Sequence, residues 1–215
     1  CSALRVLYLQ EDVADRMLSL LKGAMQELAV GDPRLLETDV GPVIDETARI
    51  SLLAHVDELR HSARLIAECT LPAQTRSGCF VPPIAFEIEH MNQLDKEHFG
   101  PVLHVIRYKA SQLDQVIEQI NNSGFGLTLG IHSRNETTAR QIDSGVRVGN
   151  VYINRNQIGA VVGVQPFGGQ GLSGTGPKAG GPHYLARFST ERTRTINTTA
   201  IGGNATLLSL ENSVV

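Results

Sequence analysis

The stretch from Val102 to Ile153, VLHVIRYKASQLDQVIEQINNSGFGLTLGIHSRNETTARQIDSGVRVGNVYI, decides the fold. It contains apolar runs of strand length, separated by segments whose apolar residues recur at helical spacing. The strands are predicted at Val102–Tyr108, Leu127–His132 and Val148–Ile153. The helices are predicted between the N-cap residues Ser111 and Asn135 and the terminating glycines Gly124 and Gly145. Strands and helices that alternate with short connections indicate a parallel sheet with helices packed on it.

The residues before this stretch continue the same pattern. Further strands are predicted at Leu4–Leu9, Leu65–Cys69 and Phe80–Ile88. Amphipathic helices are predicted from an N-cap at Asp12 to Gly31, and from Thr47 to about Arg64. Pro82 and Pro83 place the Phe80–Ile88 strand at a sheet edge or break it, because proline cannot donate to a ladder. The expected fold class is a three-layer α/β domain.

Composition excludes several classes of function. The 215 residues suit one large domain or a domain with an appendage, and 41% hydrophobic with 19% charged residues is an ordinary globular balance. A net charge of −3 without a long basic run argues against a nucleic-acid surface in this segment. No apolar run reaches the roughly 20 residues of a membrane span. Three cysteines without metal-ligand spacing indicate no metal site and a reducing compartment, which predicts a cytoplasmic protein.

A glycine-rich segment follows the last predicted strand. Gly159–Gly181, GAVVGVQPFGGQGLSGTGPKAGG, holds nine of the 21 glycines. Its spacing fits neither the dinucleotide-binding G-x-G-x-x-G nor the P-loop pattern. Ligands of open α/β sheets bind at the carboxyl ends of strands. The segment is therefore predicted to be an ordered loop whose backbone N–H groups bind a small anion.

The first residue, Cys1, allows three interpretations. The chain is a fragment or processed product in which Cys1 is a nucleophile. Alternatively it is an N-terminal-nucleophile hydrolase that uses its own α-amine as base. A third interpretation is a lipid-anchored binding module acylated on Cys1.

Four motifs in one order support the first interpretation. They are Cys1-Ser2-Ala3, Glu97-His98-Phe99-Gly100-Pro101, the run Asn122–Thr128 and Pro166-Phe167-Gly168-Gly169. Together they resemble the C-terminal, catalytic half of the aldehyde dehydrogenase superfamily, beginning at the nucleophilic cysteine. The strings GAVVGVQPFGG and SGTGPKAGGPHYL resemble the pyrroline-carboxylate dehydrogenase branch, and the tail TINTTAIGGNATLLSL resembles the bifunctional proline utilization A family of bacteria.

This resemblance implies a role for the reactive cysteine and for two cofactor residues. Cys1 is expected to attack the aldehyde carbon of L-glutamate γ-semialdehyde. Glu97 is expected to bind a ribose of NAD, and Phe99 to lie against the nicotinamide end. FAD is expected only in an upstream proline dehydrogenase module of the parent protein. Cys69 and Cys79 match no motif and are expected to be structural.

The resemblance also implies how the substrate is held. The backbone N–H groups of Gly159 and Ala160 are expected to bind the substrate carboxylate, with the Ser2 hydroxyl as a third donor. Phe167 is expected to pack on the aliphatic chain of the substrate. The mechanism needs no histidine, so His98 and His104 are assigned no role, and neither is His183.

The expected boundaries follow the same resemblance. Residues 1–187 form the catalytic domain, residues 188–199 an oligomerisation strand, and residues 200–215 a linker to a further region. The nucleotide-binding domain, the water-activating glutamate and the oxyanion-hole asparagine of the superfamily lie upstream of its cysteine. The chain alone is therefore expected to be inactive, and its parent to be a homo-oligomer or to cap the strand with an intrachain domain.

Overall fold

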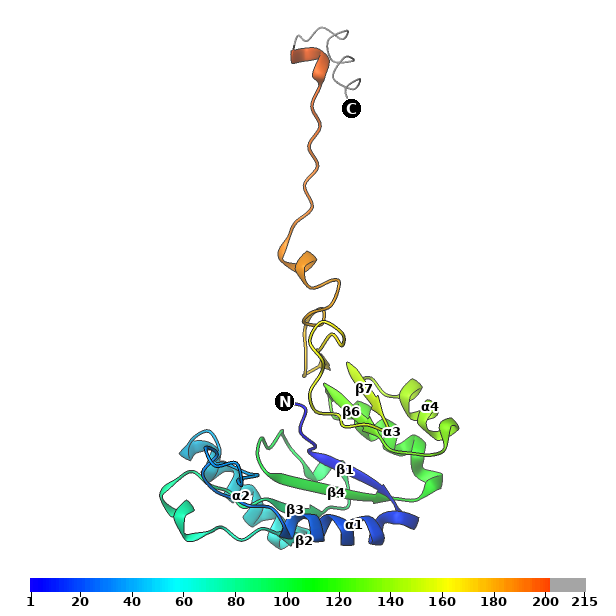
Figure 1. Ribbon diagram of the computed structural model, residues 1–215. Coiled ribbons are helices and arrows are strands. Elements are labelled where there is room, and N and C mark those ends of the chain that lie inside the picture. Colours follow the sequence, from blue (N-terminus) through cyan, green and yellow to red (C-terminus); the bar gives the residue numbers. More distant parts are fainter. Residues whose placement is uncertain (202–215) are drawn as a thin grey trace.

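The computed structural model describes residues 1–201, and its elements follow the predicted order (Figure 1). The strands are β1 (Val6–Gln10), β2 (Arg64–Glu68), β3 (Ile84–Glu87), β4 (Val102–Tyr108), β5 (Phe125–Gly126), β6 (Thr128–Ile131), β7 (Asn150–Ile153) and β8 (Gln170–Gly171). The α-helices are α1 (Glu11–Gln26), α2 (Glu46–Ser62), α3 (Leu113–Asn122) and α4 (Glu136–Gly145). The chain is therefore an α/β protein, as predicted.

A four-stranded sheet with the order β1-β4-β3-β2 forms the base of the molecule. β1, β4 and β3 are parallel, and Val6 lies opposite His104 in the register. β2 is antiparallel to β3, so the prediction of a wholly parallel sheet is wrong at this edge. The reason is the connection between β2 and β3, which holds a short 3₁₀ turn (Ala73–Ser77) and no crossover helix of the kind that parallel neighbours require.

Helices cover both faces of this sheet. On one face, Leu52 and Val56 of α2 pack with Phe86 of β3. On the other face, Ala14 of α1 packs with Val105 of β4. Successive side chains of a strand point to opposite faces, so one apolar strand contributes to both interfaces. The expected three layers are present.

The second half of the decisive stretch forms its own small unit. β6 and β7 are parallel, with Thr128 opposite Asn150, and α4 connects them. Asn135 caps α4 as predicted, because its Oδ1 accepts hydrogen bonds from the N–H groups of Thr137 and Thr138 at 3.0 and 3.2 Å. The pair is not hydrogen-bonded into the four-stranded sheet.

Two predicted N-caps are wrong. α1 begins at Glu11 after Gln10, so Asp12 lies within its first turn. Gln10 is the last residue of β1 and pairs with Tyr108, so the end of the strand sets the start of the helix. α3 begins after a 3₁₀ turn, with Gln112 rather than Ser111 at its N-cap.

The prolines before β3 break the predicted strand. β3 begins at Ile84, directly after Pro83, and lies between β4 and β2 inside the sheet. Its interior position excludes the alternative of an edge strand. The ladder begins where residues with a backbone N–H resume.

The C-terminal segment extends away from the body (Figure 1). Residues 189–197 contain no helix or strand, and residues Thr198–Ile201 form a 3₁₀ turn. The strand predicted at 188–199 is therefore not formed in the described part of the chain, where no strand of residues 1–201 lies beside it to supply hydrogen bonds. Of the predicted linker 200–215, residues 202–215 lie outside the described residues.

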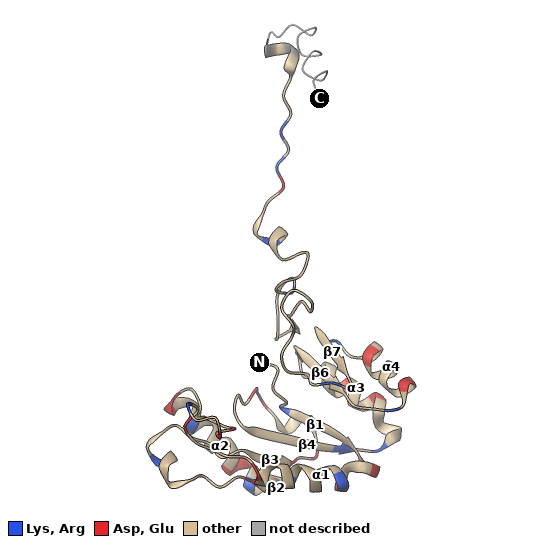
Figure 2. Cartoon of the chain, viewed as in Figure 1, with Lys and Arg blue, Asp and Glu red and all other residues tan. Residues whose placement is uncertain are grey.

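Charges of both signs are interspersed along the helices (Figure 2). Neighbouring positions form ion pairs, such as Arg49 with Glu46 on α2 and Arg140 with Glu136 on α4. No helix within residues 1–201 is long and apolar enough to cross a membrane.

Candidate active site

The predicted cofactor residues Glu97 and Phe99 lie in the loop that enters β4. Both side chains face solvent, with Glu97 42% and Phe99 60% exposed. The next residue, Gly100, packs so closely on α2 that a β-carbon there would collide with the Leu52 side chain. This contact holds the loop against α2 and leaves both side chains accessible to a ligand.

Arg5 lies between these two side chains. Its Nε is 3.8 Å from Oε1 of Glu97, and its Cζ is 4.3 Å from the centre of the Phe99 ring. The Arg5 side chain is mostly buried, at 21% exposed. The sequence reasoning did not select Arg5, although its position shortly after Cys1 was a signal. The structure thus brings the segment that carries Cys1 to the predicted cofactor loop.

Cys1 and Ser2 differ in their environments. Cys1 is exposed, whereas Ser2 is buried at 7% exposure. The side-chain amide of Gln157 donates a hydrogen bond to the Ser2 carbonyl at 3.1 Å. Gln157 lies just before Gly159 and Ala160, so this bond joins the Ser2 segment to the loop that carries the other two predicted donors. The sequence reasoning missed Gln157, because nothing in the local sequence links it to Ser2.

The loop that follows β7 exposes its backbone as predicted. Gly159 has φ 78°, a left-handed conformation that favours glycine, and a β-carbon there would meet nothing within 4 Å. Among residues 1–201, no hydrogen-bond acceptor pairs with the backbone N–H of Gly159 or Ala160. The next N–H, of Val161, is bonded at 3.1 Å to Oε1 of Gln165. Two adjacent amides are therefore free to bind a ligand.

The other end of this loop is anchored to β7. Asn150 donates to the Pro166 carbonyl at 3.1 Å, and its Oδ1 accepts from Lys178 at 3.2 Å. Lys178 also donates to the Gly149 carbonyl. The backbone of Gly168 passes so close to Gly149 that a side chain at 149 would collide with it. The half-buried Phe167 lies in this anchored part and exchanges backbone hydrogen bonds with Ala179 at 3.0 and 2.9 Å.

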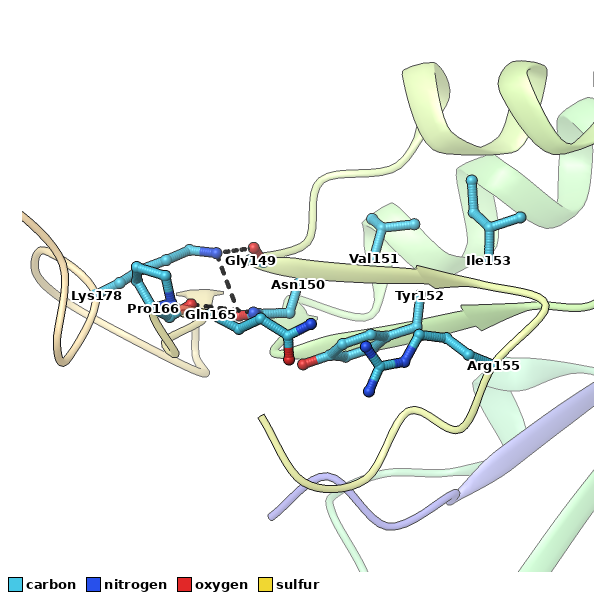
Figure 3. Close-up of a pocket in the computed structure, with 9 residues that line it drawn as sticks. All are labelled: Gly149, Asn150, Val151, Tyr152, Ile153, Arg155, Gln165, Pro166 and Lys178. Carbon is cyan, nitrogen blue, oxygen red and sulfur yellow. Dashed lines mark hydrogen bonds between the residues drawn. The ribbon is translucent and has the colours of Figure 1, made fainter. Parts of the chain in front are cut away.

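A cavity of about 380 Å³ lies at this anchor (Figure 3). Its wall includes Tyr152, whose buried hydroxyl has no hydrogen-bond partner among the described residues. The guanidinium carbon of Arg155 lies 5.1 Å from the centre of the Tyr152 ring. None of the predicted catalytic or binding residues lines this cavity, which adjoins the loop through Gln165 and Pro166. We therefore place the candidate active site at the exposed amides and the Glu97–Phe99 loop.

Three histidines form a buried cluster behind the predicted cofactor loop. The rings of His55, from α2, and His98 are stacked, with centroids 3.3 Å apart. Nε2 of His55 lies 2.8 Å from Nε2 of His104. Burial lowers the pKa of all three histidines, and that of His55 falls from 6.5 to about 4. His98 and His104 had been assigned no role from the sequence, and His55 had not been singled out.

The remaining cysteines lie in structural positions. Cys69 is buried, and its Sγ lies 3.1 Å from the Met25 carbonyl. Burial raises the pKa of both Cys69 and Cys79, and Glu46 adds to the effect at Cys79. Neither environment favours a thiolate, in agreement with the structural role expected for both. Within residues 1–201, no group of three or more histidine, cysteine or acidic side chains could hold a metal ion.

With a cysteine, an exposed Glu-x-Phe loop and a glycine-rich loop brought together on an α/β scaffold, comparison with known proteins becomes informative. Residues 1–194 match the aldehyde dehydrogenase family, and the chain belongs to that family. Its relatives include the bifunctional protein PutA of Klebsiella aerogenes, 52% identical over 197 residues. That alignment covers 89% of this chain and 15% of the relative.

Two further relatives define the branch. The 1-pyrroline-5-carboxylate dehydrogenase of Geobacillus kaustophilus is 38% identical over 187 residues, which cover 86% of this chain and 36% of that enzyme. The crystal structure of a mutant of Bradyrhizobium japonicum proline utilization A (PutA) superposes with a TM-score of 0.88 at 56% identity, covering 94% of this chain and 20% of that one. The predicted resemblance to the PutA-type module is confirmed. The chain spans about a sixth of the curated PutA relatives.

Proposed function

We propose that this chain carries the nucleophile, the cofactor contacts and the substrate loop of an NAD-dependent L-glutamate γ-semialdehyde dehydrogenase of proline catabolism. The names of its relatives, PutA and 1-pyrroline-5-carboxylate dehydrogenase, support this assignment. Family membership favours the first interpretation of Cys1 over an N-terminal-nucleophile hydrolase or a lipid-anchored module. The observation that carries the proposal is the pair of unpartnered amides at Gly159 and Ala160.

These amides suit a carboxylate. An anion accepts hydrogen bonds from adjacent backbone N–H groups, and the open space over Gly159 lets it approach them. Gln157 ties the Ser2 backbone to the segment that precedes these amides, and we assign the Ser2 hydroxyl as a third donor. A substrate that has a carboxylate at one end and an aldehyde at the other would therefore be held at both ends, since Cys1 precedes Ser2 directly. L-Glutamate γ-semialdehyde is such a substrate.

Cys1 carries out the covalent step of the proposed reaction. Its thiolate forms a bond to the aldehyde carbon, and water later cleaves the resulting thioester to release L-glutamate and the free thiol. NAD, when bound, supplies the acceptor for the hydride that this carbon loses. Cys1 is exposed, so a substrate can reach its sulfur.

The cofactor loop fits a nicotinamide nucleotide. The exposed carboxylate of Glu97 can accept hydrogen bonds from the vicinal hydroxyls of a ribose. The exposed ring of Phe99 presents an apolar face for a flat heterocycle. Arg5 holds the two side chains beside each other.

The domain boundaries belong to the same proposal. We assign residues 1–187 to the catalytic domain and residues 188–199 to a strand that pairs with a second subunit or domain. The exposed side chains of residues 189–198 suit such an external partner.

The test is NADH formation by the full-length protein. Wild type should form NADH from L-glutamate γ-semialdehyde, and Cys1→Ala should abolish turnover while NAD still binds. Cys79→Ala, at a half-buried cysteine, is the matched control and should retain nearly full activity. A wild-type protein that does not reduce NAD with this aldehyde, or a Cys1→Ala variant that still does, would contradict the proposal.

A further inference from the structure

Two independent connections join the segment that carries Cys1 to the loop that carries Glu97 and Phe99. The first is the Arg5 side chain, which contacts both residues. The second starts at the Arg5 backbone, where the carbonyl accepts hydrogen bonds from the N–H and from Nδ1 of His104, both at 3.1 Å. Arg5 thus contacts the loop with its side chain and contacts β4, the strand that follows the loop, with its main chain.

The second connection specifies the tautomers of the histidines. The Arg5 carbonyl can only accept, so Nδ1 of His104 carries a proton and the neutral ring has a bare Nε2. Nε2 of His55, 2.8 Å away, must then donate to it. Protonating His104 would reverse this bond, because Nε2 of His104 would then donate and Nε2 of His55 would have to accept.

A stacking contact connects this histidine pair to the loop that carries Glu97 and Phe99. His55 stacks on His98 with an interplanar angle of 9°. His98 lies between Glu97 and Phe99 in the sequence, and its side chain is buried whereas Glu97 and Phe99 are exposed. A series of contacts therefore runs from the Arg5 carbonyl through the buried rings of His104, His55 and His98. The sequence neighbours of His98 are the two residues that the Arg5 side chain contacts.

We propose that Arg5 is a positioning residue, which holds Glu97 and Phe99 in the arrangement that receives the nicotinamide end of the cofactor. This inference rests on the proposed function of the loop. The separation of 3.8 Å between Nε of Arg5 and Glu97 is too long for a hydrogen bond. Arg5 therefore orients the carboxylate by its charge and leaves the acceptor sites of Glu97 free for ribose hydroxyls.

The chemistry of the guanidinium explains why arginine stands here. It is planar and delocalised, so one group can lie over the Phe99 ring and face a carboxylate at its edge. A lysine ammonium is a compact, strongly hydrated charge, so it can contact either the ring or the carboxylate but is poorly suited to contact both at once. Arg5→Lys should therefore keep only part of the effect.

The experiment uses the full-length protein with Arg5→Met, Arg5→Lys and Arg140→Met. Arg140 forms an exposed ion pair on α4 and serves as the matched control. Arg5→Met should raise the KM for NAD roughly tenfold while kcat changes much less, because the lost term is cofactor binding. Arg5→Lys should recover part of this loss, and Arg140→Met should resemble wild type.

Hydrogen–deuterium exchange supplies a readout that does not depend on activity. Amides in residues 95–100 should exchange faster in Arg5→Met and at the wild-type rate in Arg140→Met. In a Glu97→Gln background, the effect of Arg5→Met on the KM should shrink, because both changes remove the same contact. A wild type that does not reduce NAD would contradict the proposed function, whereas the exchange comparison would still test the hold of Arg5 on the loop.

The inference is overturned if folded Arg5→Met keeps the wild-type KM for NAD. Wild-type exchange in residues 95–100 of that variant would overturn it as well. If Arg5→Met yields no folded protein, Arg5→Lys takes its place, and the same two outcomes decide. A fall in kcat alone, with the KM and exchange unchanged, would also overturn the inference, because Arg5 would then act on turnover and not on cofactor binding.

Discussion

The side-chain amide of Gln157 donates to the backbone carbonyl of Ser2 at 3.1 Å, across a separation of 155 residues. This bond ties the residue that follows Cys1 to the loop that carries Gly159 and Ala160. Gln157 thus connects the two segments that carry the proposed donors to the substrate carboxylate, although it is not itself one of those donors.

Gln157→Ala should weaken the site without removing any proposed donor. The lost hydrogen bond is worth about 1 kcal/mol, which corresponds to a roughly fivefold lower kcat/KM for L-glutamate γ-semialdehyde. Gln157→Glu should do the same, because a carboxylate cannot donate to a carbonyl. Gln115→Ala, at an exposed position of α3, is the control, and steady-state kinetics of the full-length protein is the measurement. Wild-type kinetics for both Gln157 variants would show that the bond does not order the site.

Ser2→Ala should act only on substrates that have a carboxylate. Removal of a hydrogen bond to a charged group costs about 1.5–3 kcal/mol, so kcat/KM for the semialdehyde should fall about 10- to 150-fold. A simple aldehyde of similar length should lose little. Phe167→Ala should weaken both substrates, because it removes packing on the aliphatic chain. Equal losses of both aldehydes in Ser2→Ala would mean that Ser2 does not bind the carboxylate.

Glu97→Gln should raise the KM for NAD by roughly tenfold, because a neutral amide forms a weaker bond to ribose than a carboxylate does. Titration of NAD with the full-length protein measures this. Glu118→Gln, at an exposed position of α3, should leave the KM unchanged. An unaltered KM in Glu97→Gln would remove Glu97 from the cofactor site.

The histidine cluster should make stability depend on pH. The pKa of His55 is lowered by burial from 6.5 to about 4, so between these values the unfolded chain binds a proton that the folded chain does not. The contribution of His55 is therefore fully present above about pH 6.5 and is lost as the pH falls toward about 4. Charged groups that face the cluster shift the histidine pKa values in both directions. The carboxylates of Asp95 and Glu58 raise them, whereas the positive charges of Lys96 and Arg5 lower them.

Urea unfolding at a series of pH values tests this. The midpoint should fall between about pH 6.5 and about pH 4, and His55→Asn should show a shallower fall. His61→Asn, on an exposed position of the same helix, should keep the wild-type slope. An identical slope in His55→Asn would exclude His55 as its source.

The C-terminal segment should determine assembly. Deletion of residues 191–199 should leave the body folded, because these residues make no strand contacts with it, and should lower the oligomeric state of the full-length protein. Light scattering measures the mass. An unchanged mass would contradict the proposed role of residues 188–199.

Local sequence determined most of the elements. Apolar spacing predicted β4, α3 and α4 to within a few residues, and Asn135 was recognised as a cap because its acceptor reaches N–H groups of the same helix. The glycine-rich loop was recognised for a similar reason, since a left-handed residue such as Gly159 restricts its own sequence. Interactions of this kind involve only residues close together in the sequence, so the local sequence is enough to predict them.

Only the tertiary structure decided which residues meet. The contacts of Arg5 with Glu97 and Phe99, and of Gln157 with Ser2, join segments far apart in the chain, and no periodicity encodes them. The direction of β2 was also decided by packing, because strand pairing depends on the connection and on the neighbours available. The energy of strand pairing and side-chain packing arises between elements of structure. Sequence patterns within each element therefore specified the helices and strands, whereas the contacts between elements specified the site.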